Sequence, residues 1–246
     1  MRFELIPLLE RMQQFYQLPR NSQRFSTYLD MLLGESREDV VLPIAAFNPL
    51  GKELVMEKLK QLINMRAEEL MQEVISEVNA SIGSSDKRTI SVGLNLLDDI
   101  GGAWSERFTT DYSSKFDFGS LHKRNFCLPS FWTSETLSAE MIGPRTKEYL
   151  FRTLYWLEHG KPQSLRDHMD QEVFVYSNTR KGRVRQLDDD FLADTEVFYE
   201  QHADSTDHNL IFNFFYGDAA CEVLHQKTRG ISEQAGFRYA DYLADE

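Results

Sequence analysis

The sequence predicts a mainly α protein: an irregular multi-helix bundle of about nine helices, with little or no β structure. Apolar residues recur at three- and four-residue spacing through most of the chain, which is the period of an amphipathic helix. Glycines and prolines separate these stretches, and no internal repeat is visible. The 246 residues are enough to bury a sizeable core. We expect a single helical domain over 1–246, with a sub-domain break at 81–88.

Two helices are expected in the first 34 residues. The first has an apolar stripe over 3–18 and ends at Pro19, and the second is capped by Asn21 or Ser22 and ends at Gly34. Their short connection predicts an antiparallel pair. Residues 35–50 contain two prolines and no period, so we interpret them as a connector.

The most regular stretch, 51–81, predicts one long helix with an apolar face and a charged face. The polar segment 81–88 that follows marks the possible sub-domain break. Residues 89–94 fit either a short strand or the start of another helix.

Four aromatic residues spaced four apart continue this helical pattern. They follow the pair Gly101-Gly102 and are Trp104, Phe108, Tyr112 and Phe116. Because each interior glycine costs a helix about 1 kcal/mol relative to alanine, the pair indicates either close packing or a functional break. Residues 117–131 lack any period and predict a long loop.

The rest of the chain again predicts helices. A short helix over 134–141 is interrupted at Gly143-Pro144, and the next carries Glu148 and Arg152 as an exposed pair four residues apart. Ser164 opens a capping box for a helix to about residue 176. A basic loop then spans Arg180 to Arg185, where it could hold a phosphate, although 172–187 could instead form a hairpin. Helices near 190–202, 207–224 and 232–243 complete the chain.

Composition excludes several classes of protein. The net charge of −12 opposes general nucleic-acid binding, which needs a positive face. No apolar run approaches the roughly 18 residues of a membrane span. The two cysteines, Cys127 and Cys221, form no C-x-x-C motif, which argues against a disulfide scaffold and indicates a reducing compartment. We therefore expect a soluble, cytoplasmic protein.

An acidic block is the strongest anomaly of composition. Between Gln186 and Gln226 there are ten carboxylates and no Lys or Arg. Two of these carboxylates share a helical face, and an E-x-x-H pair follows, which together would make half of a carboxylate-bridged site for two divalent metal ions. A full site needs a second E-x-x-H, which the chain lacks; the alternative is a solvated acidic face with aspartates at helix N-termini. The candidate ligands are Glu196, Glu200, His202, His208, Glu222 and His225.

The aromatic stretch is the second candidate site. Its rings could form the apolar walls of a ligand pocket, and the basic residues after it could hold a small anionic ligand. The alternative is that the aromatic ladder is core and the following loop only covers it. The candidate pocket residues are Trp104, Phe108, Tyr112, His122, Arg124 and Trp132.

The sequence contains no nucleophile elbow, phosphate-binding loop, dinucleotide motif, zinc-protease motif or EF-hand loop. Because catalytic motifs are missing and charge is segregated, we predict a non-catalytic binding or interaction protein. It would engage a protein partner or a small anionic ligand through the acidic helical face or the aromatic pocket. The alternative is a metal-dependent enzyme with its carboxylate and histidine site on the C-terminal helices.

Overall fold

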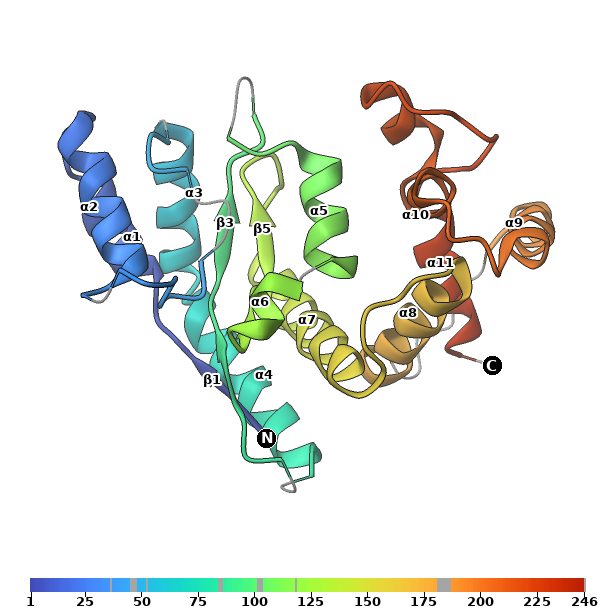
Figure 1. The fold of residues 1–246 in the computed structure, drawn as a ribbon, viewed down its shortest axis with the longest axis horizontal. Coiled ribbons are helices and arrows are strands. Elements are labelled where there is room, and N and C mark those ends of the chain that lie inside the picture. The colour runs from blue at the N-terminus through green and yellow to red at the C-terminus, as the bar shows by residue number, and fades with distance from the viewer. Residues whose placement is uncertain are drawn as a thin grey trace. The chain divides into compact units, whose positions relative to one another are not determined.

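A computed structural model describes most of the chain. The described residues are 1–35, 37–44, 48–51, 53–83, 86–100, 104–117, 119–180 and 187–245. Within these ranges the chain forms eleven helices and five short strands (Figure 1). The mainly α prediction is confirmed, but the helices outnumber the nine expected and the strands pair in parallel, which we did not expect.

The chain divides into two compact units. The first comprises Met1–Ser114 and Phe118–Leu150, and the second comprises Lys115–Asp117 and Phe151–Glu246. The possible break at 81–88 falls inside the first unit, and residues 84 and 85 lie outside the described ranges. The single-domain organisation stays a prediction.

Parallel strands form the centre of the first unit. These strands are β1 (Arg2–Leu5), β2 (Thr89–Val92), β3 (Asn95–Leu97), β4 (Phe126–Cys127) and β5 (Ser130–Trp132). One sheet has the order β1-β2-β4, and β3 pairs with β5 beyond it. Backbone bonds from Gly93 N to Cys127 O (3.1 Å) and from Asn95 N to Pro129 O (3.0 Å) continue the pairing between the two sheets. The backbone pairing is therefore nearly continuous from one sheet to the other.

Helices return the chain between these parallel strands, as parallel pairing requires. Between β1 and β2 lie α1 (Leu9–Tyr16), α2 (Ser22–Leu33), α3 (Glu53–Asn64) and α4 (Ala67–Ser81). Between β3 and β4 lie α5 (Arg107–Phe116) and α6 (Gly119–Lys123), and α7 (Ala139–His159) follows β5. Every residue of β3 and β5 is buried. Gly93 lets the sheet pass close to the connector, because a Cβ there would lie 2.5 Å from the carbonyl oxygen of Pro43.

Several element predictions in this unit are wrong. Phe3 belongs to β1, so the expected helix over 3–18 is confined to α1. The expected helix over 51–81 is divided by Arg66, which has a left-handed φ of 55°. The loop expected at 117–131 contains α6, β4 and part of β5. Strands buried on both faces do not alternate polar and apolar residues, which is why their sequences resemble helix. The strand alternative for 89–94 is confirmed by β2.

The second unit is helical. Besides the end of α7 it contains α8 (Leu165–Thr179), α9 (Asp189–His202), α10 (His208–Val223) and α11 (Ala235–Leu243). The capping box at Ser164 is confirmed, and α8 replaces the hairpin considered for 172–187. Helix α11 packs against α8, α9 and α10. Its Phe237 ring lies 4.9 Å from Phe215 of α10, which lies 4.9 Å from Phe116.

Helix α7 corrects two further predictions. It continues through Pro144, which sits in its second turn and removes a single backbone hydrogen bond there. Arg152 was expected to be exposed, but its side chain is 1% accessible and forms a bidentate pair with the buried Glu172 (2.8 and 2.6 Å). Among the described helices, none is both long enough and apolar enough to cross a membrane.

Candidate functional site: an acidic groove on the second unit

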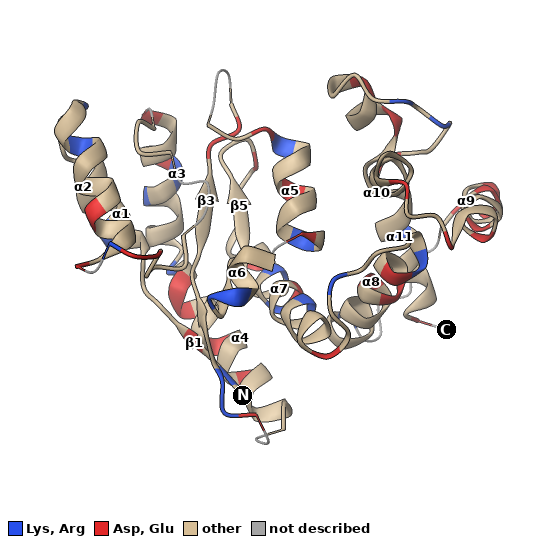
Figure 2. Ribbon diagram, viewed as in Figure 1, with Lys and Arg blue, Asp and Glu red and all other residues tan. Residues whose placement is uncertain are grey.

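Helix α9 has one apolar face and one acidic face. Asp188 caps its N-terminus, accepting the backbone N–H groups of Asp190 (3.1 Å) and Phe191 (3.2 Å). From this start the helical period turns Phe198 toward Phe214 of α10, with stacked rings 5.6 Å apart. The opposite face is red in Figure 2. In all, α9 carries five exposed carboxylates, which are Asp189, Asp190, Asp194, Glu196 and Glu200.

A kink in α10 positions the loop that faces α9. Gly217 has a φ of 81°, and a Cβ on it would lie 2.8 Å from the backbone of Glu233. The next residue, Asp218, accepts backbone N–H groups of Arg229 (3.0 Å), Gly230 (2.9 Å) and Ile231 (3.3 Å). One carboxylate therefore fixes the start of the 229–235 loop.

Replacing Asp218 with alanine is expected to lower the free energy of unfolding by about 2 kcal/mol, because three backbone donors lose their acceptor at a partly exposed site. Burial alone would raise the pKa of Asp218, but these donors and Asn213 outweigh it and the pKa is lowered. Stability from this carboxylate is thus present above about pH 4 and lost as pH falls through its folded pKa. Urea unfolding at neutral pH and at pH 3 measures both effects.

The matched variant for this prediction is Asp218→Asn, which keeps one acceptor oxygen but cannot ionise. Its unfolding free energy should fall less steeply with acid than that of the wild type. An unchanged pH profile in Asp218→Asn would contradict the role assigned to the charge.

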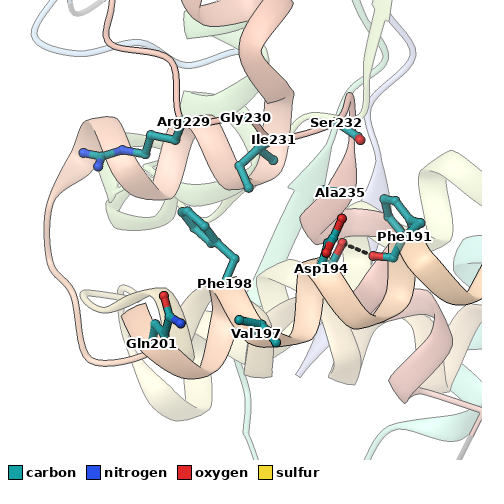
Figure 3. Close-up of a pocket in the computed structure, with 11 residues that line it drawn as sticks. Phe191, Asp194, Val197, Phe198, Gln201, Arg229, Gly230, Ile231, Ser232 and Ala235 are labelled. Atoms are coloured by element: carbon teal, nitrogen blue, oxygen red, sulfur yellow. Dashed lines mark hydrogen bonds between the residues drawn. The ribbon is translucent and has the colours of Figure 1, made fainter.

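A pocket of about 330 Å³ lies between α9 and the 229–235 loop. Its lining residues are Phe191, Asp194, Thr195, Val197, Phe198, Gln201, Arg229, Gly230, Ile231, Ser232 and Ala235. In Figure 3 the Phe198 ring points from α9 toward Ile231 on the loop. Val197 is 52% exposed at its edge, and Arg229 pairs with Asp207 at 3.0 Å. We call this pocket, together with the five carboxylates of α9, the acidic groove.

The acidic groove suits a side chain with an apolar stem and a cationic head. Lysine and arginine bury their methylene groups against apolar surface while keeping the charge in water. Phe198, Val197 and Ile231 offer that apolar surface, and Asp194 lies on the same lining. The neighbouring carboxylates of α9 would attract further cations nearby.

The six predicted metal ligands all belong to this unit, but they do not converge. Among the described residues, no group of three or more His, Cys, Asp or Glu side chains could hold a metal ion. Glu196, Glu200 and Glu222 are exposed. The expected E-x-x-H pair is not on one helical face, because α10 ends at Val223 and His225 takes a left-handed φ of 55°.

The two remaining predicted metal ligands, His202 and His208, lie on different helices. His202 lies in the last turn of α9, with its ring 4.6 Å from Phe198. His208 is exposed in the first turn of α10. The geometry thus places the acidic block on the surface, where Asp188 and Asp207 cap helices as one alternative predicted.

The six predicted pocket residues are spread over the first unit. Trp132 is buried at the end of β5, whereas His122 and Arg124 precede β4. The extended segment from the start of β4 to the end of β5 spans roughly 20 Å at about 3.3 Å per residue. Burial lowers the pKa of His122, and nearby Arg88 lowers it further. Arg124 donates to Asp39 at 2.7 Å.

On α5, Tyr112 is buried and Phe108 is half-buried, while Trp104 before the helix is 53% exposed. The aromatic ladder is therefore partly core. Among the described residues, the six predicted pocket residues do not line one common pocket. The Gly101-Gly102 break and residues 181–186 of the basic loop lie outside the described ranges. Arg180 itself donates to Asp241 at 2.8 Å.

The two units thus define a small parallel α/β unit followed by a helical unit with an acidic groove. Comparison with known proteins finds no family model that the chain matches, no similar curated protein and no similar solved structure. The function proposed below therefore depends on the geometry of the described residues.

Proposed function

We propose that the second unit is a protein-binding module, and that its acidic groove holds a basic, partly apolar segment of a partner protein. One observation carries this proposal: the pocket that Asp194 lines lies on α9, a helix that bears four further exposed carboxylates. The exposed side chain of Val197 lies at the edge of this pocket, where a bound apolar group would remove it from water.

Apolar and charged contacts would have different parts in this binding. Burying one leucine-sized side chain contributes about 1.5–3 kcal/mol, whereas exposed ion pairs contribute little each. Insertion of an aliphatic side chain between Phe198 and Ile231 would therefore set most of the affinity. The carboxylates would select basic partners and speed their association in a salt-dependent way.

The test uses short fluorescein-labelled peptides and fluorescence anisotropy with the full chain. A peptide of alternating lysine and leucine should bind saturably, and more weakly as salt rises. Alternating lysine and serine should bind at least about tenfold more weakly, since one lost apolar contact of about 1.4 kcal/mol already has that effect. Alternating glutamate and leucine should not bind.

Two outcomes would overturn the proposal. One is the absence of saturable lysine–leucine binding up to about 1 mM, the range of the weakest specific contacts. The other is equal affinity for the lysine–serine peptide, which would leave no role for the apolar lining.

A further inference from the structure

The carboxyl end of β3 and β5 gathers polar side chains in the first unit. Asp98 and Asp99 follow β3 directly, and Thr133, Ser134 and Glu135 follow β5. The strands are parallel, so both sets of residues lie at the same edge. In open parallel α/β sheets this edge is where ligands bind.

Most of these groups satisfy one another. Asp99 accepts the Ser134 hydroxyl at 2.6 Å and the Thr133 hydroxyl at 3.0 Å. Glu135 accepts two nitrogens of Arg145 (2.6 and 3.1 Å) and one of Arg107 (2.9 Å). Burial alone would raise the pKa of Glu135, but the two arginines outweigh it and the pKa is lowered. This part of the edge is a closed ion-pair network.

Asp98 is different. It is 7% exposed and accepts the Asn48 amide at 2.9 Å. It also lies 3.3 Å from the Thr133 hydroxyl, whose one hydrogen it shares with Asp99. It has no cationic partner among the residues that the structure describes. Removing an ionised carboxylate from water without a cation is costly. A buried carboxylate held only by neutral donors has acceptor capacity left for a ligand.

Two more buried polar atoms lie close by along the chain. Within the described ranges, Ser105 Oγ and Arg107 Nη1 have no hydrogen-bond partner. The backbone N–H of Ser105 donates to the carbonyl of Asp98 at 3.3 Å, which brings this segment back to the strand end. Arg107 Nη1 lies 3.6 Å from Asp99. The same edge therefore holds a buried carboxylate without a cation and a guanidinium nitrogen without a hydrogen-bond partner.

A hydroxyl group can hydrogen-bond to the Asp98 carboxylate and to Arg107 Nη1 at the same time. Each hydroxyl can donate to the Asp98 carboxylate and accept from the Arg107 guanidinium. An anion would be repelled by Asp98 and Asp99, and a metal cation by Arg107. We propose that this edge binds the vicinal hydroxyls of a sugar, either free or as the ribose of a nucleoside.

The experiment is isothermal titration calorimetry of the full chain with D-ribose, D-glucose and adenosine. The controls 2-deoxy-D-ribose and 2′,3′-dideoxyadenosine lack the 2,3-diol of ribose. We expect saturable binding of at least one diol ligand, weakened at least tenfold in its control compound. Binding of a free sugar identifies a saccharide source, and binding of adenosine alone identifies a nucleoside. No saturable binding of any of the three up to about 10 mM would overturn the proposal.

The variant Asp98→Asn keeps the shape of the side chain and removes the charge. It should raise the dissociation constant at least tenfold, whereas Asp86→Asn, which precedes the amino end of β2, should not. It should also raise the Tm, since a buried charge without a cation is removed. Unchanged ligand affinity in Asp98→Asn would overturn the proposal. A lowered Tm would do so as well, because the charge would then be structural.

Discussion

Replacing Glu172 with leucine is expected to lower the free energy of unfolding by about 3–5 kcal/mol, because it leaves the buried Arg152 without its carboxylate. The side chains of this pair are 1% and 0% accessible, and their bidentate contacts are 2.8 and 2.6 Å long. Gln171 also donates to Glu172 at 3.0 Å, and it accepts from the indole of Trp156 at 3.1 Å. Removing Glu172 would therefore also disturb the hydrogen bonds that hold α7 against α8.

The double variant Arg152→Met/Glu172→Leu should recover much of this loss. Well-packed apolar residues of similar volume can replace a buried ion pair with little cost, whereas removing one partner cannot. Urea unfolding followed by circular dichroism measures all three proteins. The control is Arg166→Met, which breaks the exposed Arg166–Asp204 pair (52% and 88% accessible) and should change little. A Glu172→Leu protein as stable as the Arg166→Met control would contradict this account.

Reversing two charges on α9 is expected to weaken binding of the lysine–leucine peptide by about tenfold to a hundredfold at low salt. The variant is Glu196→Lys/Glu200→Lys, whose positions are four apart and exposed. Because neither side chain lines the pocket, the loss reports on electrostatic attraction and not on shape. Anisotropy titrations at low and high salt measure it, and high salt should reduce the difference from the wild type.

The matched control for that variant is Glu53→Lys/Glu57→Lys. These glutamates are also exposed and four apart on a helix, α3, but they belong to the first unit. Both variants change the net charge equally. If the control loses as much affinity as the α9 variant, only the total charge matters and the acidic groove has no particular role.

The sequence was informative where local interactions determine structure. Ser164 and its capping box predict the start of α8, and the spacing of carboxylates predicts the acidic face of α9. Strands β3 and β5 were missed because they are buried on both faces, so their sequences lack the alternation of a half-exposed strand. Buried parallel strands and short helix segments cannot be separated by periodicity alone.

The opposite wall of the acidic groove could not be predicted. Ile231 reaches α9 only because Asp218 holds the loop from within α10, and no periodicity relates these positions. Arg152 illustrates the same limit. Its neighbour four residues away, Glu148, suggested an exposed local pair, whereas Glu172 lies twenty residues away in sequence and is the buried partner.

The most direct test of the protein-binding proposal is a nuclear magnetic resonance titration of the ¹⁵N-labelled chain with the lysine–leucine peptide. We predict that the largest shifts of backbone amides fall on Asp194, Val197, Phe198, Gly230 and Ile231, and saturate together. Shifts confined to other residues, or spread over the acidic surface without saturation, would contradict the proposal.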